Sequence, residues 1–71
     1  MPIQLNETLL SPAEAARRAP GQPHLSTIWR WMKRGNRGVV LESVVCAGRR
    51  YTSLEAIARF VEATTAAAQL G

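Results

Sequence analysis

Cationic and hydroxyl side chains share one short stretch of the chain, residues 24–34, with three large apolar residues. Ile28, Trp31 and Met32 follow the three-and-four spacing that places them on one side of an amphipathic helix. The positions between them combine hydrogen-bonding groups with three fixed positive charges, and they are Ser26, Trp29, Arg30, Lys33 and Arg34. Gly35 follows a basic last turn and predicts the end of this helix, because glycine accepts the left-handed backbone found there.

The exposed side of this helix has the chemistry needed to contact nucleic acid. A guanidinium halfway along a helix, as at Arg30, can fork onto the O6 and N7 atoms of a guanine. Cations near the helix end and in the following loop suit phosphates, which position a protein without specifying sequence, and these are Lys33, Arg34 and Arg37. Trp29 has two readings that stay open: it lies over sugar and phosphate, or it is a second core aromatic.

Positive charge is concentrated in the middle of the chain. Residues 17–50 hold eight of the nine Lys and Arg residues but only one of the five acidic residues, Glu42, in a chain of formal net charge +4. A solvated surface normally mixes the two signs. This segregation predicts a surface that binds a polyanion, of which nucleic acid is the commonest. The plainer alternative is a basic surface that serves only solubility.

A predicted β-hairpin carries a second cationic group. Residues 39–46 are rich in β-branched side chains and predict a strand, Ala47-Gly48 predicts a turn, and residues 49–52 return as a second strand. Arg49 at the narrow tip has the shape that a minor groove accepts. We expect the odd positions of the first strand to face the core, although Val40 and Val44 make the other register nearly as good. These odd positions are Val39, Leu41 and Val45.

A shorter helix precedes the basic one. Ser11, Pro12 and Glu14 supply a cap, a proline at the first helical position and a capping-box glutamate. This helix must end before residues 20–23, which hold two prolines and a glycine. Two short helices joined by a tight turn, the second of them basic, have the pattern of a helix-turn-helix. His24, at the end of the turn, could cap the second helix or touch a phosphate, and we favour a role as a cap or a solvent-facing residue.

Residues 52–55 repeat the capping-box pattern, with Thr52 as the cap, and predict a third helix. Its expected buried stripe is Leu54, Ile57, Ala58, Val61 and Thr65, widened by Phe60. Residues 63–71 are mostly Ala and Thr, so we expect a tail that frays or meets another protomer. Residues 1–8 are expected to be a lead-in with little structure, after which Leu9 or Leu10 lies against the core. The chain, residues 1–71, is then one small domain with α+β composition.

Several classes of protein lack support in the sequence. One cysteine and one histidine make neither a disulfide nor a structural zinc site. There is no phosphate-binding loop and no carboxylate pair beside a nucleophile, so we expect a protein that is not an enzyme and needs no cofactor. No apolar run is long enough for a membrane span, and the start lacks the features of a signal peptide. We therefore expect no membrane partner and a cytoplasmic location.

The order of these elements, from residue 8 to residue 62, resembles the excisionase-like branch of the MerR-type winged helix-turn-helix proteins. This branch includes phage and mobile-element excisionases and small regulators. The motifs that carry the resemblance are Ser-Thr-Ile-Trp-Arg-Trp-Met-Lys-Arg-Gly at 26–35 and Gly-Arg-Arg-Tyr-Thr-Ser at 48–53. A family of uncharacterised small planctomycete proteins is also similar. This second resemblance implies the same fold but no particular function.

The resemblance implies that residues 24–34 enter a major groove and that a wing, residues 46–51, reaches the neighbouring minor groove. It places Ser26 and Arg30 at base-contacting positions. It also places Lys33 at a phosphate or groove-edge position, Arg49 at the wing tip and Trp31 in the core. Ser26 departs from the pattern, because relatives can have a charged or longer residue there, so a base preference does not transfer.

The sequence thus predicts an α+β winged helix-turn-helix domain that binds double-stranded DNA sequence-specifically, as an excisionase (recombination directionality factor) or a transcriptional regulator. The expected DNA-binding residues are Ser26, Thr27, Trp29, Arg30, Lys33, Arg34, Arg37, Arg49 and Arg50. Expected partners are duplex DNA in a nucleoid-associated complex, further copies bound cooperatively, and an integrase or other recombination protein. The alternative is a protein-interaction or RNA-binding module that uses the same basic face, although only Trp29 is free to stack on bases.

Overall fold

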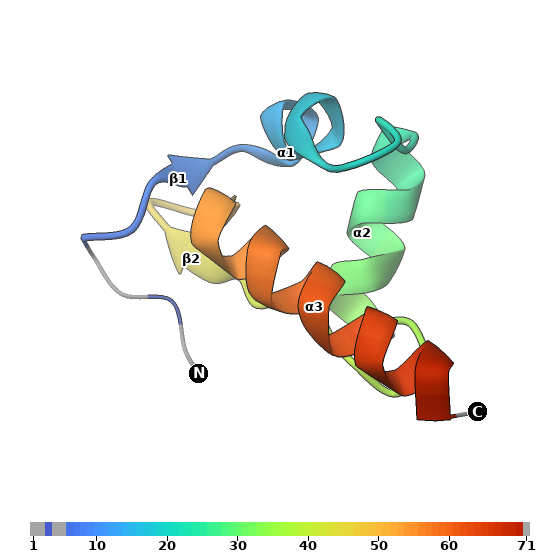
Figure 1. Ribbon diagram of the computed structural model, residues 1–71. Coiled ribbons are helices and arrows are strands. Elements are labelled where there is room, and N and C mark those ends of the chain that lie inside the picture. The colour runs from blue at the N-terminus through green and yellow to red at the C-terminus, as the bar shows by residue number, and fades with distance from the viewer. Residues whose placement is uncertain (1–2, 4–5, 71) are drawn as a thin grey trace.

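The computed structural model describes residues 3 and 6–70, and this part of the chain folds into three helices and a three-stranded antiparallel sheet (Figure 1). The elements in chain order are β1 (Leu9–Leu10), α1 (Pro12–Arg18), α2 (Leu25–Lys33), β2 (Val44–Cys46), β3 (Arg49–Ser53) and α3 (Leu54–Leu70). The strand order is β1-β3-β2. The α+β composition predicted from the sequence is therefore confirmed.

The start of α1 matches the capping box read from the sequence. The Ser11 hydroxyl accepts a hydrogen bond from the Glu14 amide at 3.2 Å, and the Glu14 carboxylate accepts one from the Ser11 amide at 3.4 Å. The helix ends at Arg18, and the chain turns through Gly21 and Gln22, both with positive φ. Small side chains at Ala15 and Ala19 are buried, which lets α1 approach the rest of the core closely.

The strand predicted over residues 39–46 is shorter than expected. Residues 40–43 lie outside regular structure, and the Leu41 amide donates to the Trp31 carbonyl at 2.9 Å instead of joining a ladder. Leu41 is buried as predicted, but Val45 is 67% exposed, so the prediction that Val45 faces the core is wrong. The physical reason is that residues 40–43 are not part of the strand, so the alternation of faces does not continue from Leu41 to Val45; within β2 it is Val44 that is half-buried.

Residues 9–10, which follow the predicted lead-in, join the sheet. Leu10 is buried and pairs with Thr52, while Leu9 pairs with Ser53. The ladder continues where the Leu54 amide donates to the Thr8 carbonyl at 3.0 Å. The hairpin thus gains a third strand that the sequence analysis did not predict. The lead-in prediction also covers residues 1–2 and 4–5, which lie outside the described residues.

The cap of α3 lies one residue later than predicted. The Ser53 hydroxyl accepts from the Ala56 amide at 2.8 Å, whereas the Thr52 hydroxyl donates to the Glu42 carbonyl at 2.8 Å. The Glu55 carboxylate does not close a capping box with Thr52; it accepts from the Thr8 amide at 2.9 Å. Because β3 runs directly into α3, the two adjacent hydroxyls have different roles. Ser53 caps the helix, and Thr52 bonds to the segment before β2.

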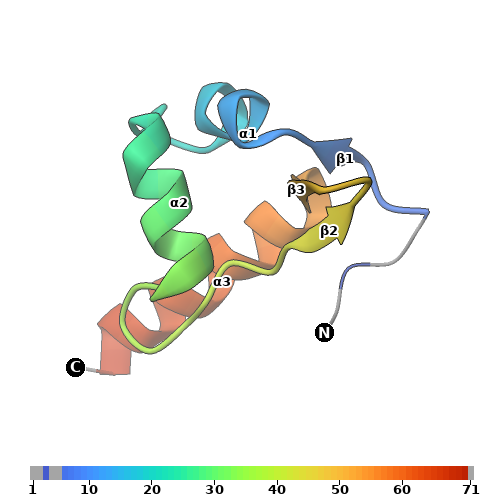
Figure 2. The ribbon, with the colours of Figure 1, turned by 180° about the vertical axis from the view of Figure 1, so that it is seen from behind.

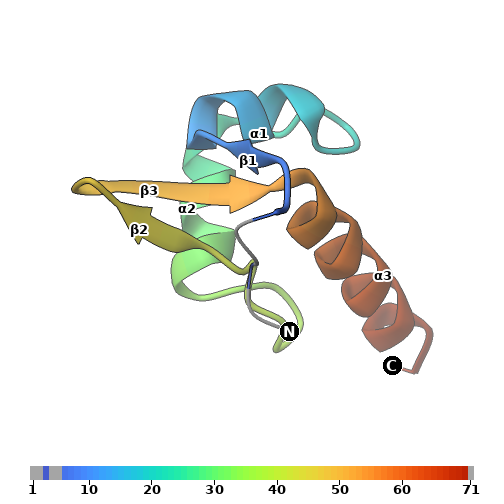
Figure 3. The same ribbon diagram turned by 90° about the vertical axis from the view of Figure 1, so that its left-hand side faces the viewer.

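The buried face of α3 is also rotated from the predicted stripe. Ile57 and Phe60 are buried, as predicted, and so is Ala56, which was not predicted. Of the residues predicted to face the core, Leu54, Ala58 and Thr65 are exposed and Val61 is half-buried. The helix continues to Leu70, where the sequence predicted a frayed tail from residue 63, and Figure 3 shows it leading away from the sheet. Residue 71 lies outside the described residues.

The core lies between α1, α2, α3 and the sheet. Its buried apolar residues are Leu10, Ala15, Ala19, Ile28, Met32, Leu41, Ala56, Ile57 and Phe60. Two of the three residues predicted to anchor the basic helix, Ile28 and Met32, belong to this set. The third, Trp31, is half-buried and stacks on Phe60 with ring centroids 4.8 Å apart and planes tilted by 37°. Aromatic packing therefore ties α2 to α3.

Candidate nucleic-acid interface

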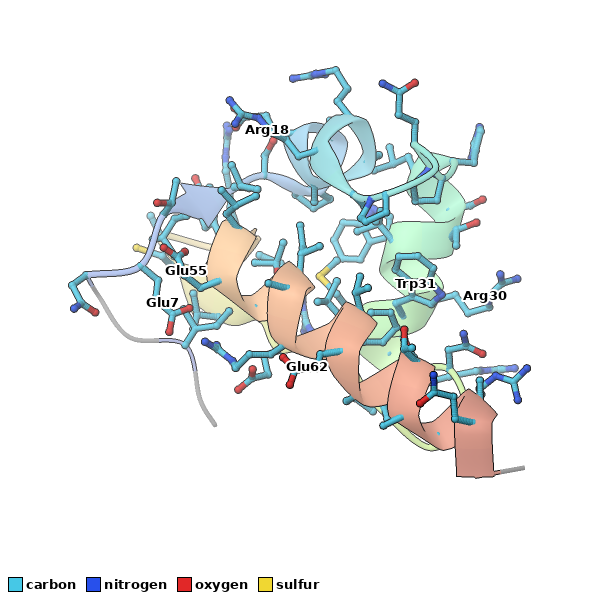
Figure 4. The ribbon with its side chains drawn as sticks, viewed as in Figure 1. Glu7, Arg18, Arg30, Trp31, Glu55 and Glu62 are labelled. Carbon is cyan, nitrogen blue, oxygen red and sulfur yellow. The ribbon has the colours of Figure 1, made fainter. Side chains whose placement is uncertain are left out.

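The outward side of α2 is cationic, as the sequence predicted. Arg30, Lys33 and Arg34 are all exposed. Figure 4 shows Arg30 extending away from α3 while the next residue, Trp31, points toward it. This arrangement follows from the helical rotation of about 100° per residue, which separates consecutive residues onto different faces. Because Ile28 and Met32 are buried in the core and Trp31 packs on Phe60, the cationic side is held in a fixed orientation.

The start of α2 is capped by a histidine rather than by one of the usual small polar residues. His24 Nδ1 accepts a hydrogen bond from the Ser26 amide at 3.2 Å and lies 3.0 Å from the Ser26 hydroxyl. The expectation that His24 caps this helix is thus confirmed. Ser26 is exposed, yet its hydroxyl already has a partner. Thr27, the next predicted site residue, is half-buried.

Arg37 lies on a tight turn that follows α2. The Asn36 amide donates to the Val39 carbonyl at 2.7 Å and the Val39 amide donates back at 2.9 Å. Arg37 and Gly38 have positive φ values of 53° and 78°, which is the backbone of a type I′ turn. Arg37 is therefore exposed on a hydrogen-bonded turn rather than on a loose loop.

The hairpin separates its two arginines into different environments. Ala47 and Gly48 form the predicted turn, with positive φ values of 53° and 77°. Arg49 directly after the turn is exposed, whereas Arg50 is half-buried and its Nη1 donates to the Ser43 hydroxyl at 3.2 Å. Arg50, predicted from the sequence as a binding residue, thus holds the hairpin to the segment before β2. Nothing in the sequence singled out Ser43 as its partner.

The sequence left open whether Trp29 is a core residue or a surface residue that contacts DNA, and its environment combines features of both. Its side chain is half-buried and packs against the core. It also lines a hollow of about 360 Å³ between α2, the hairpin and the start of α1, where Ser11 and Pro12 form the third wall. These walls come from parts of the sequence that are far apart, so spacing along the chain could not have predicted the hollow.

The cationic elements lie on the same side of the molecule. Figure 2 shows α2 and the hairpin toward the viewer with α3 behind them. We call the exposed cations of these two elements the basic face, and they are Arg30, Lys33 and Arg34 on α2 and Arg49 on the hairpin. Two elements that are separate in sequence, each with exposed cations, therefore lie on the same side of the fold.

Two other arginines lie outside this face. Arg59 on α3 donates to the carboxylates of Glu7 at 3.1 Å and Glu42 at 2.8 Å. Hydrogen bonds to Glu7 and then Glu42 raise the pKa of the Arg59 guanidinium above its ordinary value. Its charge is balanced by these carboxylates. Arg18, at the end of α1, lies against α3 rather than beside α2.

The described part of the chain has neither a candidate metal site nor a helix suited to span a membrane. No group of three or more His, Cys, Asp and Glu side chains in residues 3 and 6–70 is placed to hold a metal ion. Among the described helices, none has the length and apolar character needed to cross a membrane.

Comparison with known proteins places the chain in a family. Residues 12–65 match the model of a protein family, DUF1580, whose description is "protein of unknown function". The match spans α1 through most of α3, and the chain belongs to this family. No curated protein and no solved structure matches it.

Proposed function

We propose that this protein is a winged helix-turn-helix protein that binds double-stranded DNA sequence-specifically and is not an enzyme. In this proposal α2 enters the major groove and the hairpin β2–β3 acts as a wing in the adjacent minor groove. The observation that supports it best is the basic face: its cations are exposed, and they belong to a short helix and a hairpin that Figure 2 shows on the same side of the molecule. An α-helix fits the major groove of B-DNA, and a narrow minor groove attracts arginine.

The environments of the side chains suggest separate roles within this proposal. Arg30 is exposed in the middle of α2 and would read a base edge, with guanine as the best match for its two donors. Lys33, Arg34 and Arg37 lie at or beyond the helix end and would contact phosphates. Ser26 would read a base only after exchanging its contact with His24, so it is the weaker candidate.

The biological setting that we propose is control of recombination, as an excisionase, or of transcription. Both settings need a small protein that binds DNA and recruits others. An integrase or another recombination protein, and further copies bound cooperatively, are the proposed partners. The proposed location is the cytoplasm, in association with the nucleoid.

Selection from random duplexes tests the proposal. The protein is incubated with a pool of randomised double-stranded DNA, bound molecules are recovered over several rounds, and the enriched sequence is synthesised as a labelled duplex. We expect binding at least 10³-fold tighter than to a scrambled duplex at the same salt concentration, the lower end of the range for specific DNA binders, about 10³ to 10⁷.

Matched nucleic acids distinguish the alternatives. Single-stranded RNA and duplex RNA of the same sequence serve as competitors in the same titration. If RNA competes better than the enriched duplex, the basic face belongs to an RNA-binding module. If the selection enriches no sequence and scrambled DNA binds equally well, sequence-specific recognition is wrong.

A further inference from the structure

A groove between α1 and α3 lies apart from the basic face. It has a volume of about 400 Å³, and its floor consists of Leu54, Ile57, Ala58 and Val61 of α3. Pro20, just after α1, closes one end of the apolar lining. Leu54 is 40% exposed although it stands at the start of the helix, beside the sheet. The groove therefore leaves large apolar side chains in contact with water.

This groove explains why the sequence pattern of α3 predicted the buried residues Ile57 and Phe60 correctly but also placed Leu54 and Ala58 in the core. The helix has apolar residues on two adjacent sides: Ala56 and Phe60 face the core, whereas Leu54, Ala58 and Val61 face the groove. A sequence pattern does not distinguish an apolar side that packs within the chain from one that packs on a partner. Apolar surface left open on a small domain is a common mark of an interaction site.

The two edges of the groove carry opposite charges. Arg18 lies on the α1 edge and Glu62 on the α3 edge, and Figure 4 shows them on these separate elements. Neither side chain forms an ion pair with another described residue. In a two-fold dimer each surface patch meets its own copy. A two-fold axis that runs along the groove exchanges the two edges, so it brings each Arg18 opposite the Glu62 of the other copy.

We infer that the groove binds a second copy of this chain. In the dimer, Leu54 and Val61 of one copy lie against the same residues of the other and remove the apolar floor from water. Two Arg18–Glu62 pairs between copies then flank this contact and fix its register, which is the usual contribution of charges at the rim of an interface. An axis across the groove would place like charges together and is therefore disfavoured.

The dimer has a consequence for DNA that rests on the proposed function. The groove lies on α3, which is in front in Figure 1 and behind α2 and the hairpin in Figure 2. A two-fold contact through α3 therefore directs the two basic faces away from each other. Such a dimer would hold two duplex segments together rather than occupy neighbouring sites on one straight duplex.

The oligomeric state without DNA tests the dimer. Sedimentation equilibrium over a range of protein concentrations should show a reversible monomer–dimer equilibrium for the native chain. Arg18→Glu and Glu62→Arg should each weaken the dimer roughly tenfold or more, because each change removes two rim ion pairs and introduces repulsion. The double variant should restore the native dissociation constant. Arg17→Glu, on the same helix but outside the groove, is the matched control and should leave it unchanged.

Several results would overturn the inference. A native chain that stays monomeric throughout the concentration range means that the groove does not bind a second copy. Single charge reversals without effect, or a double variant as weak as the singles, would show that Arg18 and Glu62 do not meet. Far-ultraviolet circular dichroism checks that each variant is folded, so that a loss of the dimer is not a loss of structure.

A separate experiment tests the arrangement of the two basic faces. Two short duplexes with different fluorophores, both carrying the enriched site, are mixed with the protein and followed by two-colour co-diffusion. We expect co-diffusion that is lost in Arg18→Glu and restored in the double variant. DNA binding and dimerisation without co-diffusion would overturn the outward arrangement. Failure to bind DNA would overturn the proposed function but leave the dimer, which is measured without DNA, intact.

Discussion

At the scale of single residues, the fold gives neighbours on α2 opposite tasks. Trp31 packs on Phe60, while Arg30 beside it extends into solvent. The sequence predicted both orientations, because helical spacing sorts side chains onto faces. It could not predict that Ser26 would contact His24 or that Arg50 would donate to Ser43, since such contacts depend on backbone positions that only the folded chain sets.

Two arginines on α2 should have different effects on DNA binding. Arg30→Ala should cost about 1 to 3 kcal/mol on the enriched duplex and relax its base preference, because a base contact is lost. Arg34→Ala should weaken the enriched and scrambled duplexes alike, as expected for a phosphate contact. Fluorescence anisotropy on both duplexes measures the two effects. An equal loss on both duplexes for Arg30→Ala would remove Arg30 from the base-reading set.

Trp31 should matter for folding rather than for direct contact with DNA. Trp31→Ala should cost about 3 kcal/mol, the low end for a tryptophan deletion, because the ring is half-buried. That is a large share of the total stability of a domain this small, roughly 5 kcal/mol. Urea denaturation followed by circular dichroism measures it, with Trp31→Phe as the control that keeps the aromatic contact. An alanine variant with native stability would show that the Trp31–Phe60 contact does not support the fold.

At the scale of elements, the sequence predicted the helices well and the sheet less well. The capping residues and the Pro-Gly turn predicted the ends of α1 and α2 to within about one residue, because these signals are local. β1 has only two residues, and it forms through pairing with β3 more than forty residues later in the chain. No local pattern could predict that pairing. The buried side of α3 was predicted only in part: Ile57 and Phe60 are buried as expected, but Leu54, Ala58 and Thr65 are exposed, because the apolar residues of α3 occupy two sides.

The turn after α2 should depend on Gly35 more than the hairpin depends on Gly48. Both have positive φ, so alanine at either position costs about 1 to 2 kcal/mol of backbone strain. A Cβ at Gly35 would also clash with the Val39 carbonyl oxygen, whereas one at Gly48 meets nothing within 4 Å. Overpacking of this kind adds about 1 to 3 kcal/mol. Thermal unfolding of Gly35→Ala and Gly48→Ala measures the difference, and equal losses would contradict the close approach of Val39.

At the scale of the whole molecule, the positive charge that is concentrated in one part of the sequence is also concentrated on one part of the surface. The exposed cations of residues 30–49 lie on α2, its following turn and the hairpin. Glu7 and Glu42 surround Arg59 and balance it. The sequence predicted that a basic surface exists. It did not predict the groove between α1 and α3, because Arg18 and Glu62 are brought to the same groove only by tertiary packing.

Binding by one copy should be weak and sensitive to salt. The proposal assigns four phosphate or groove contacts, from Lys33, Arg34, Arg37 and Arg49. The logarithm of the binding constant should then fall with the logarithm of the salt concentration with a slope of about −4. Arg49→Ala should lower affinity most where the flanking sequence is rich in A·T pairs and has a narrow minor groove. Anisotropy titrations at several salt concentrations, on duplexes that differ only in the flank, measure both effects. If Arg49→Ala lowers the affinity equally for all flanking sequences, Arg49 contacts only phosphate and does not recognise the minor groove.

The most direct test of the central claim, that the basic face binds duplex DNA, is an NMR titration. Amide resonances of the ¹⁵N-labelled protein are followed while the enriched duplex is added at a fixed salt concentration. We expect the largest shifts at residues 25–34, at the turn around Arg37 and at the hairpin tip around Arg49, with small shifts at the α3 amides that face the groove. Shifts that cluster on α3 and spare α2 and the hairpin would contradict the assignment of the DNA-binding face.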